Sequence, residues 1–322
     1  MKATVIDRFG GPEVLTLAEC EIGEPGPGEL RVRQKAIGLN FIDVYHRTGL
    51  YPNPLPLVPG SEGAGEVVAV GPDVSGFSVG DRVAYQGALG AYAEERLLPA
   101  ARAVPLPEAI SYETAAAIML KGLTAYYLLF LTWPLKPGET ILFHAAAGGV
   151  GQIACQWAKS LGATVIGTAG SAEKLAIAKA HGCDHVINYA EEDFPDRVRE
   201  ITEGRGVDVV YDGVGQATFE KSLDCLRKRG LMVSFGNATG PVSIPDLGIL
   251  SRKGSLYLTR PTGVDYFAER PALLAGARAL FSAVESGAIT VNIGQRYALA
   301  DAAEAHRALE GRQTTGSTIL LP

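Results

Sequence analysis

The stretch "HAAAGGVG", His144 to Gly151, decides the fold of this chain. It ends the short apolar run "TILFHA", which predicts a buried strand, and it leads into "GGVGQIACQWAKSLGA", whose apolar side chains recur on one helical face. Aligned on Ala146, Gly148 and Gly151, the turn reads A-x-G-x-x-G. This is a variant of the dinucleotide-binding fingerprint in which alanine replaces the first glycine.

A single turn of this kind could serve only to pack a helix closely on a strand, so the residues that follow have to decide. From Thr140 onward, buried strands alternate with helical stretches. The expected helices include "SAEKLAIAKAHG", "EDFPDRVREIT" and "ATFEKSLDCLRKRG", and the basic triplet Arg227-Lys228-Arg229 is expected at the end of the last one. This alternation predicts an α/β fold with a doubly wound parallel sheet of the Rossmann type.

In such a fold the glycine-rich turn holds a dinucleotide. Gly148 would let the backbone approach a pyrophosphate, and Gly151 would let the helix pack on its strand. The amide groups at the helix N-terminus would then face the phosphates. The second strand ends in "GTAGSAEK", Gly167 to Lys174, without the acidic residue that binds an NAD ribose. Gly170, Ser171 and Lys174 suit a 2′-phosphate instead, which favours NADPH.

The N-terminal part of the chain has a different sequence pattern. Residues 1–120 are predicted to be mostly strand, because short β-branched runs such as "GEVVAVG" alternate with Gly/Pro turns. A helix is expected from Ser111 onward in "SYETAAAIMLKGLTAYYLLF". Two more helices, near 270–286 and 301–310, and a last strand, "STILL", are expected in the tail.

Composition excludes several classes of partner. The net charge of −6 argues against binding to nucleic acid or to an anionic membrane surface. No apolar run is expected to approach the roughly 20 residues needed to span a bilayer. The N-terminus lacks the apolar core of a secretory signal. The four cysteines are far apart in the sequence, which favours free thiols and a cytoplasmic location.

Several long motifs carry a resemblance that covers essentially the whole chain. "NFIDVYHRTGLYP", "PGSEGAGEV", "GDRVAY", "KGLTAYYLL" and "HAAAGGVGQIACQWAK" resemble the zinc-free, zeta-crystallin-like branch of the medium-chain dehydrogenase/reductase superfamily. The resemblance implies a GroES-like, mainly β domain formed by residues 1–120 and 261–322. A Rossmann NADPH-binding domain, residues 121–260, would be inserted between them. It also implies a homodimer joined through the Rossmann domains, with "SLYLTR" as the edge strand.

Departures from zinc-dependent relatives are informative. Those enzymes carry a Cys at or next to the position of Asp43, and Gly-His-Glu where this chain has Gly60-Ser61-Glu62. With two ligands of the usual set missing, no catalytic metal is expected. The four clustered cysteines of the structural zinc lobe are absent as well.

The resemblance also implies site residues. The cleft beside the nicotinamide would be lined by Asn40, Tyr45, Tyr51 and Lys121, where the Asn40 amide could donate to a substrate carbonyl. Besides Asn40 and Lys121, the positions expected to contact NADPH are Thr124, Gly148, Gly149, Val150, Gly151, Gly170, Ser171, Lys174, Tyr189, Phe235, Gly236, Asn237 and Arg312.

The expected chemistry is hydride transfer from NADPH to a quinone, which needs positioning and hydrogen bonds to the developing oxyanion. An enone or 2-alkenal reductase on the same scaffold stays open as an alternative. A non-enzymatic role, as in relatives recruited as lens crystallins or RNA-binding proteins, is the third, although the acidic charge disfavours RNA binding.

Overall fold

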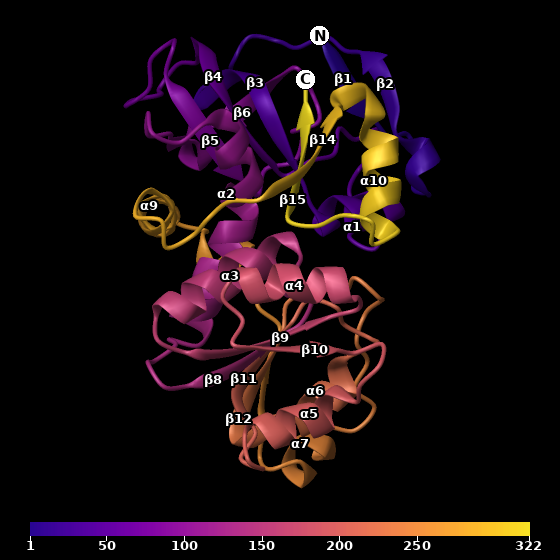
Figure 1. The fold of residues 1–322 in the computed structure, drawn as a ribbon. Helices are drawn as coiled ribbons and strands as arrows, with labels where there is room; N and C mark the ends of the chain where they lie inside the picture. Colours follow the sequence, from indigo (N-terminus) through magenta and orange to yellow (C-terminus); the bar gives the residue numbers. More distant parts are fainter. The chain divides into compact units, whose positions relative to one another are not determined.

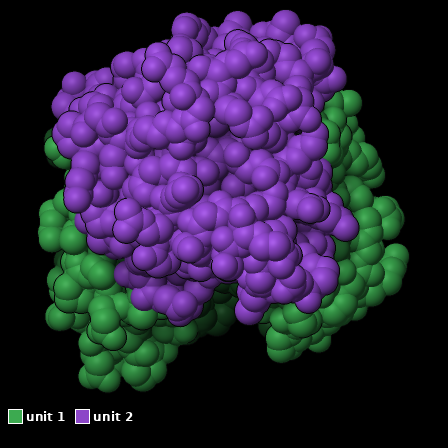
Figure 2. Space-filling view, turned by 90° about the horizontal axis from the view of Figure 1, so that it is seen from below, with its two compact units in different colours: residues 1–123, 267–285, 291–322 green, residues 124–266, 286–290 purple.

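The computed structural model describes all 322 residues of the chain. The chain divides into two compact units, which are green and purple in Figure 2. Unit 1 comprises residues 1–123, 267–285 and 291–322, and unit 2 comprises residues 124–266 and 286–290. The last part of the chain therefore belongs to the same unit as the first.

Unit 2 is built on a six-stranded sheet with the strand order β10-β9-β8-β11-β12-β13, in which every pair is parallel. Numbered along the chain, this is the order 3-2-1-4-5-6 of the dinucleotide-binding Rossmann fold. Figure 1 shows α3 and α4 on one face of the sheet and α5 and α6 on the other. The predicted doubly wound parallel sheet is confirmed.

The elements of unit 2 follow one another in βα alternation. They are β8 (Thr140–Phe143), α3 (Gly149–Ser160), β9 (Thr164–Ala169), α4 (Ala172–Ala180), β10 (His185–Asn188), α5 (Phe194–Ile201), β11 (Val207–Asp212), α6 (Phe219–Asp224), β12 (Leu226–Ser234), α7 (Gly248–Arg252), β13 (Tyr257–Thr259) and α8 (Gly263–Tyr266). The central strand β11, "VDVVYD", is buried at all six positions, as expected for a parallel strand covered on both faces.

One predicted helix of unit 2 is shorter than expected. "ATFEKSLDCLRKRG" forms a helix only over Phe219–Asp224, and the basic triplet Arg227-Lys228-Arg229 lies in strand β12. The placement of the triplet at a helix end was therefore wrong. Leu226 pairs with Val207 of β11, so sheet pairing overrides the helical tendency of these residues.

Unit 1 is mainly β. Its larger sheet has the order β14-β15-β3-β4-β5-β7, with β6 also paired to β3, and only β14 and β15 run parallel. The strands of unit 1 are β1 (Lys2–Val5), β2 (Thr16–Glu19), β3 (Glu29–Leu39), β4 (Glu62–Val70), β5 (Arg82–Gln86), β6 (Glu95–Pro99), β7 (Val104–Pro105), β14 (Ile293–Ala298) and β15 (Ser317–Leu321). Strands β1 and β2 form a separate two-stranded sheet. The pairing of β15 with β3 ties the C-terminal segment to the N-terminal part of the chain.

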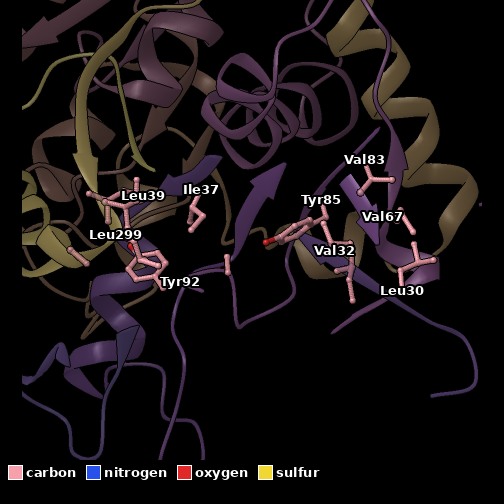
Figure 3. Packing of buried hydrophobic residues seen from close by; sticks show 14 of the residues in the cluster. Leu30, Val32, Ile37, Leu39, Val67, Val83, Tyr85, Tyr92 and Leu299 are labelled. Atoms are coloured by element: carbon pink, nitrogen blue, oxygen red, sulfur yellow. The ribbon is translucent and has the colours of Figure 1, made fainter. Parts of the chain in front are cut away.

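The hydrophobic core of unit 1 is formed largely by buried side chains of this sheet. In the first part of β3, Leu30 and Val32 are buried while Arg31 and Arg33 are more exposed, which gives the two-residue period of a half-buried strand. Figure 3 shows the labelled side chains in two groups, with Leu30, Val32 and Val67 in one and Tyr92 and Leu299 in the other. Leu299, from the C-terminal segment, thus packs in a core made mainly by N-terminal residues.

The helices of unit 1 are α1 (Phe41–Thr48), α9 (Arg270–Glu285) and α10 (Ala302–Glu310), together with most of α2 (Tyr112–Tyr126). Those near 270–286 and 301–310 were predicted, and the hydroxyl of Ser111 caps α2 by accepting from the Thr114 amide at 3.0 Å. Helix α1 was not predicted, although Asn40 and Asp43 form a capping box at its start and Gly49, in the left-handed region, ends it.

Helix α2 continues as a π-helical stretch, Tyr127–Thr132, so that Tyr112–Thr132 is one helical run of 21 residues. By length and composition this run could cross a membrane, so the expectation that no run approaches that length was wrong. Lys121 and Gly122 interrupt the apolar residues of this run, which is why its length was not recognised in the sequence. In the structure, 67% of its most apolar window is buried inside the protein, as in a core helix.

Candidate active site

Helix α1 begins directly after the long strand β3 and places Asn40 at the junction. The Asn40 backbone N–H donates to the Asp43 carboxylate at 2.9 Å, which satisfies one of the free amides at the start of the helix. The Asn40 side-chain nitrogen donates to Glu62 at 2.8 Å and lies 3.4 Å from the Gly38 carbonyl oxygen. The amide hydrogens that we expected to face a substrate carbonyl therefore already have acceptors within the protein.

Glu62, at the start of β4, is the centre of this arrangement and is completely buried. One of its oxygens accepts from Asn40 and from the Lys121 ammonium, the latter at 3.0 Å. The other accepts from the Leu120 backbone N–H at 2.6 Å. Because an ammonium has three N–H donors and Glu62 takes one, Lys121 has two more to offer to a ligand.

A second buried carboxylate, Asp43, has a different set of partners. It accepts from the Tyr92 hydroxyl at 3.1 Å and from the Ser61 hydroxyl at 3.4 Å. Burial raises the pKa of Asp43 to about 7, against the lowering effect of the Asn40 N–H, Tyr92 and Lys121. The Tyr92 hydroxyl also contacts the ring of His306 at 3.0 Å, and burial lowers the pKa of His306 to about 3. We call Asn40, Asp43, Glu62, Tyr92, Lys121 and His306 the polar centre.

The two expected cleft tyrosines form one aromatic pair on and just after α1. The rings of Tyr45 and Tyr51 meet edge to face, with their centroids 5.2 Å apart. The Tyr51 backbone N–H donates to the Tyr45 carbonyl at 3.1 Å, which holds the turn between them. Tyr45 is buried and Tyr51 is half-buried, so they can present a ring edge or a ring face to a flat ligand.

In unit 2, the glycine-rich turn connects β8 to α3. A Cβ atom on Gly151 would lie 2.5 Å from the Ala145 carbonyl oxygen and 2.7 Å from the Ala146 Cα, so only glycine fits there. A Cβ atom on Gly148 would meet one atom, the Ala145 oxygen, at 3.2 Å. Gly148 is the N-cap of α3, and Gly149, Val150 and Gly151 form its first turn. The turn thus leaves room beside Gly148 and the free amides of the helix N-terminus.

The next turn, after β9, contains the three residues that were expected to bind a 2′-phosphate. Gly170 and Ser171 follow the last strand residue, and Ser171 caps α4 by accepting from the Lys174 backbone N–H at 3.3 Å. The Ser171 hydroxyl keeps its own hydrogen for a ligand. Glu173 is exposed and Lys174 is half-buried in the first turn of α4.

The remaining cofactor candidates of unit 2 also follow the carboxyl ends of strands. Tyr189 comes directly after β10, and its hydroxyl lies so close to Gly170 that a Cβ there would be 2.7 Å away. Phe235, Gly236 and Asn237 come directly after β12. Because carboxyl ends of parallel strands meet at one edge of a sheet, the turns after β8, β9, β10 and β12 share that edge, where ligands bind in open α/β sheets.

Two candidates lie elsewhere. Thr124 is on α2, three residues after Lys121 and so on the same side of the helix. Arg312 belongs to unit 1, in the turn after α10, with φ of 57°. The predicted site residues therefore fall into a set in unit 1 (Asn40, Tyr45, Tyr51, Lys121 and Arg312) and a set in unit 2.

Our sequence reasoning did not select four residues of the polar centre: Asp43, Glu62, Tyr92 and His306. Asp43 entered only as a departure from a zinc-binding pattern, Glu62 only as the last residue of Gly60-Ser61-Glu62, and His306 was interpreted as structural. A signal for Glu62 existed, since a charged residue at the start of the apolar run "EGAGEVVAV" needs a buried partner. No group of three or more His, Cys, Asp or Glu side chains is arranged to hold a metal ion.

Comparison with known proteins agrees with this architecture. The family described as "Alcohol dehydrogenase GroES-like domain" matches residues 26–108, and "Zinc-binding dehydrogenase" matches residues 149–274. The chain is 58% identical over 316 residues to a quinone oxidoreductase of Pseudomonas aeruginosa, covering 98% of this chain and 97% of the relative. It is 47% identical over 332 residues to a 2-haloacrylate reductase of a Burkholderia species, covering 99% and 98%.

Among solved structures, the quinone oxidoreductase of Escherichia coli complexed with NADPH matches with a TM-score of 0.98 and 53% identity, over 100% of both chains. The predicted fold class, a Rossmann domain with a GroES-like domain, is confirmed by these matches. With the parallel sheet, the glycine-rich turn and full-length relatives in agreement, the chain belongs to the quinone oxidoreductase family of the medium-chain dehydrogenase/reductase superfamily.

Proposed function

We propose that this chain is an NADPH-dependent quinone reductase that transfers hydride to a quinone without a metal ion. The observation that carries the proposal is the match along the whole chain, at 53% identity and a TM-score of 0.98, to a quinone oxidoreductase whose structure holds NADPH. The expectation that no metal takes part rests on Asp43 and Ser61, which stand where zinc-dependent relatives carry ligands.

The residues of unit 2 fit NADPH. The open space beside Gly148 and the N-terminus of α3 suit a pyrophosphate, which the amides of the first helical turn would bind. Ser171 and Lys174 would bind the 2′-phosphate, because a hydroxyl and an ammonium both donate hydrogen bonds to it. Tyr189, Phe235 and Asn237 would contact the rest of the cofactor. When bound, NADPH supplies the hydride, from C4 of its nicotinamide ring.

The residues of unit 1 would act on the quinone. Lys121 would donate from its two remaining N–H groups to the quinone oxygen on which negative charge develops, while Glu62 holds the ammonium in place. Tyr45 and Tyr51, whose rings contact each other, would present one aromatic surface to the flat ring of the quinone. Asn40 would contribute through its position beside Lys121, since its amide nitrogen is bonded to Glu62.

A steady-state assay tests this proposal. We expect rapid oxidation of NADPH with 1,4-benzoquinone, a much higher kcat/KM with NADPH than with NADH, and no oxidation of simple alcohols. A chelator should leave the rate unchanged. Absorbance of the reduced cofactor measures all four results, and alcohol oxidation that a chelator abolishes would contradict the proposal.

The 47% identity to a 2-haloacrylate reductase supports a second candidate, reduction of a carbon–carbon double bond conjugated to a carbonyl group. Hydride would then add to a carbon atom of that double bond, and no quinone would be reduced. Lys121 could stabilise an enolate as it would a hydroquinone anion. Identification of the reaction product therefore distinguishes the two candidate functions.

We also propose a homodimer formed through unit 2. Strand β13 is the edge of the parallel sheet, and the side chain of Tyr257 on it is 59% exposed. An exposed edge strand with an exposed aromatic residue is suited to pairing with a second copy. A cytoplasmic location, with neither nucleic acid nor a membrane as partner, is proposed as well, supported by the net charge of −6 and by four cysteines without a disulfide.

A further inference from the structure

Asn40 is held at two points by two different buried carboxylates. Its side-chain amide is bonded to Glu62, whose charge is balanced by direct contact with Lys121. Its backbone N–H is bonded to Asp43, which has no Lys or Arg in direct contact. A buried carboxylate without a cation is costly, so the question is what stabilises Asp43 in place.

The answer is a chain of hydrogen bonds whose direction can be assigned. Arg47 donates from Nη1 to His306 Nδ1 at 3.1 Å, and since arginine has only donors, Nδ1 must be an acceptor. In a neutral imidazole the hydrogen then lies on Nε2, which donates to the Tyr92 oxygen at 3.0 Å. The Tyr92 hydroxyl in turn donates to Asp43. Every link points from the cation toward the carboxylate.

This series of hydrogen bonds is buried along its length and begins at residues of the C-terminal segment. Arg47 is 1% exposed, and its guanidinium is bidentate with Glu310 at 2.7 and 2.8 Å. His306 and Glu310 lie one helical turn apart on α10, while Arg47 is on α1. Tyr92 comes from the segment between β5 and β6. Three elements distant in sequence thus supply the links that end on Asp43.

We propose that Arg47, His306 and Tyr92 are positioning residues that hold Asn40 in place through Asp43, so that helix α10 belongs to the substrate site. This inference rests on the proposed function only in giving Asn40 a place beside the reacting quinone. The hold on Asn40 itself is a property of the protein alone.

The groups around Asp43 determine how the hold responds to pH. Glu62 from β4 opposes its ionisation, whereas Lys121 from α2 and Tyr92 favour it. His306 from α10 stays neutral, and Arg47 supplies the charge at the far end. Because the Tyr92 hydrogen bond lowers the pKa of Asp43, its removal should move the titration of Asp43 to higher pH.

The test compares two buried tyrosines of the same core. Tyr92→Phe removes the link to Asp43, and Tyr85→Phe removes an equally buried hydroxyl that is bonded to Gln34 instead. The backbone amide resonance of Asn40, followed by NMR between pH 5 and 9, reports on its hydrogen bond to Asp43. Glu310→Gln, at a residue whose side chain is 34% exposed, is a milder perturbation of the same chain.

We expect the Asn40 resonance of the parent protein to titrate near pH 7, and Tyr92→Phe to move the midpoint upward by about one unit. Glu310→Gln leaves the Arg47 charge without its counter-ion, so it should move the midpoint less and downward, and Tyr85→Phe should leave it unchanged. In the quinone assay at pH 7, Tyr92→Phe should lower kcat about tenfold and Tyr85→Phe should not.

If Tyr92→Phe and Glu310→Gln both behave like Tyr85→Phe in the Asn40 titration, the inference is overturned. If the titrations differ as expected but the parent protein reduces no quinone, the positioning chain stands and the proposed function fails. If the resonance moves without a loss of kcat, Asp43 holds Asn40 but the site does not depend on it, which overturns the role of α10 in the substrate site.

Discussion

The carboxyl edge of the parallel sheet in unit 2 and the polar centre of unit 1 are built from different parts of the chain. At the sheet edge, the proposed pyrophosphate site consists of backbone amides, two glycines and a helix N-terminus, and these residues all lie between Gly148 and Gly151. In the polar centre, polar and charged side chains at positions 40, 43, 62, 92, 121 and 306 are brought together by tertiary packing. A backbone site depends on local fit, whereas a side-chain site depends on every partner being present.

The largest effect should follow from removing the centre of the side-chain site. Glu62→Ala takes an acceptor from Asn40, Lys121 and Leu120 at once and leaves a buried ammonium without a partner. We expect a loss of about 3–5 kcal/mol in the free energy of unfolding, measured with urea. Glu66→Ala on the same strand breaks only a half-exposed pair with Lys35 at 3.8 Å and should cost less than about 1 kcal/mol. Equal losses would contradict the buried-pair argument.

The same site should respond to pH in two opposite ways. The pKa of Asp43 is raised from 3.8 to about 7, so its contribution to stability is present below pH 4 and is lost as the pH rises to 7. The pKa of His306 is lowered from 6.5 to about 3, so its contribution is present above pH 6.5 and is lost as the pH falls toward 3. Between these limits the two effects oppose each other.

Single substitutions should separate the two effects. When the pH is lowered from 7 to 4.5, the stability of Asp43→Asn relative to the parent should fall by about 3 kcal/mol. That of His306→Gln relative to the parent should rise by about 3 kcal/mol. Urea unfolding at both pH values measures the differences, in which the effects of all other carboxylates cancel. Changes of the same sign in both variants would show that the two groups are not buried as described.

The backbone site should fail in a different manner. Gly151→Val would place its side chain against Ala145 and Ala146, an overpacking cost of about 1–3 kcal/mol that should lower the melting temperature without cofactor. Gly148→Val would fill the space beside the helix N-terminus and should abolish NADPH binding with a smaller change in melting temperature. Melting curves and binding titrations on both variants measure this. The assignment of the two glycines is wrong if Gly148→Val melts earlier than Gly151→Val.

The smallest effect concerns the choice between the two cofactors. Lys174→Ala should weaken NADPH binding by about 1–3 kcal/mol and leave NADH binding nearly unchanged, because only NADPH carries the 2′-phosphate. Lys179→Ala, on the same helix but bonded to the Asp184 carbonyl, is the matched control and should affect neither cofactor. Calorimetric titration gives both affinities. Equal weakening of both cofactors by Lys174→Ala would mean that Lys174 acts through the fold.

This contrast explains what the sequence could predict. The order of strands and helices in unit 2 was predictable because each βα unit is local, and the turn at Gly148 and Gly151 because its spacing follows from backbone geometry. The strand segment Leu226–Arg229 was missed because sheet pairing, rather than local tendency, determines it. Helix α1 was missed although its capping residues Asn40, Asp43 and Gly49 are local signals. Asn40 and Lys121 were selected by resemblance, but nothing in their sequence neighbourhoods indicates that Glu62 joins them.

The partners of Asp43 were the least predictable part. Tyr92 and His306 are 49 and 263 positions away from it. Each one alone reads as an ordinary core residue, and only their hydrogen bonds in the folded chain give them a role. A lone histidine in a helix such as "AAEAHRALE" carries no signal for the tyrosine that it contacts.

A competition between two acceptors distinguishes quinone reduction from double-bond reduction. The protein is given NADPH together with equal concentrations of 1,4-benzoquinone and 2-chloroacrylate, and the products are identified by chromatography after a fixed fraction of NADPH is consumed. A reaction without enzyme corrects for direct reduction of the quinone by NADPH. We predict that hydroquinone accounts for nearly all the enzyme-dependent oxidation of NADPH. If 2-chloropropionate is the main product and hydroquinone does not exceed the control, the chain is a double-bond reductase and the proposed function is wrong.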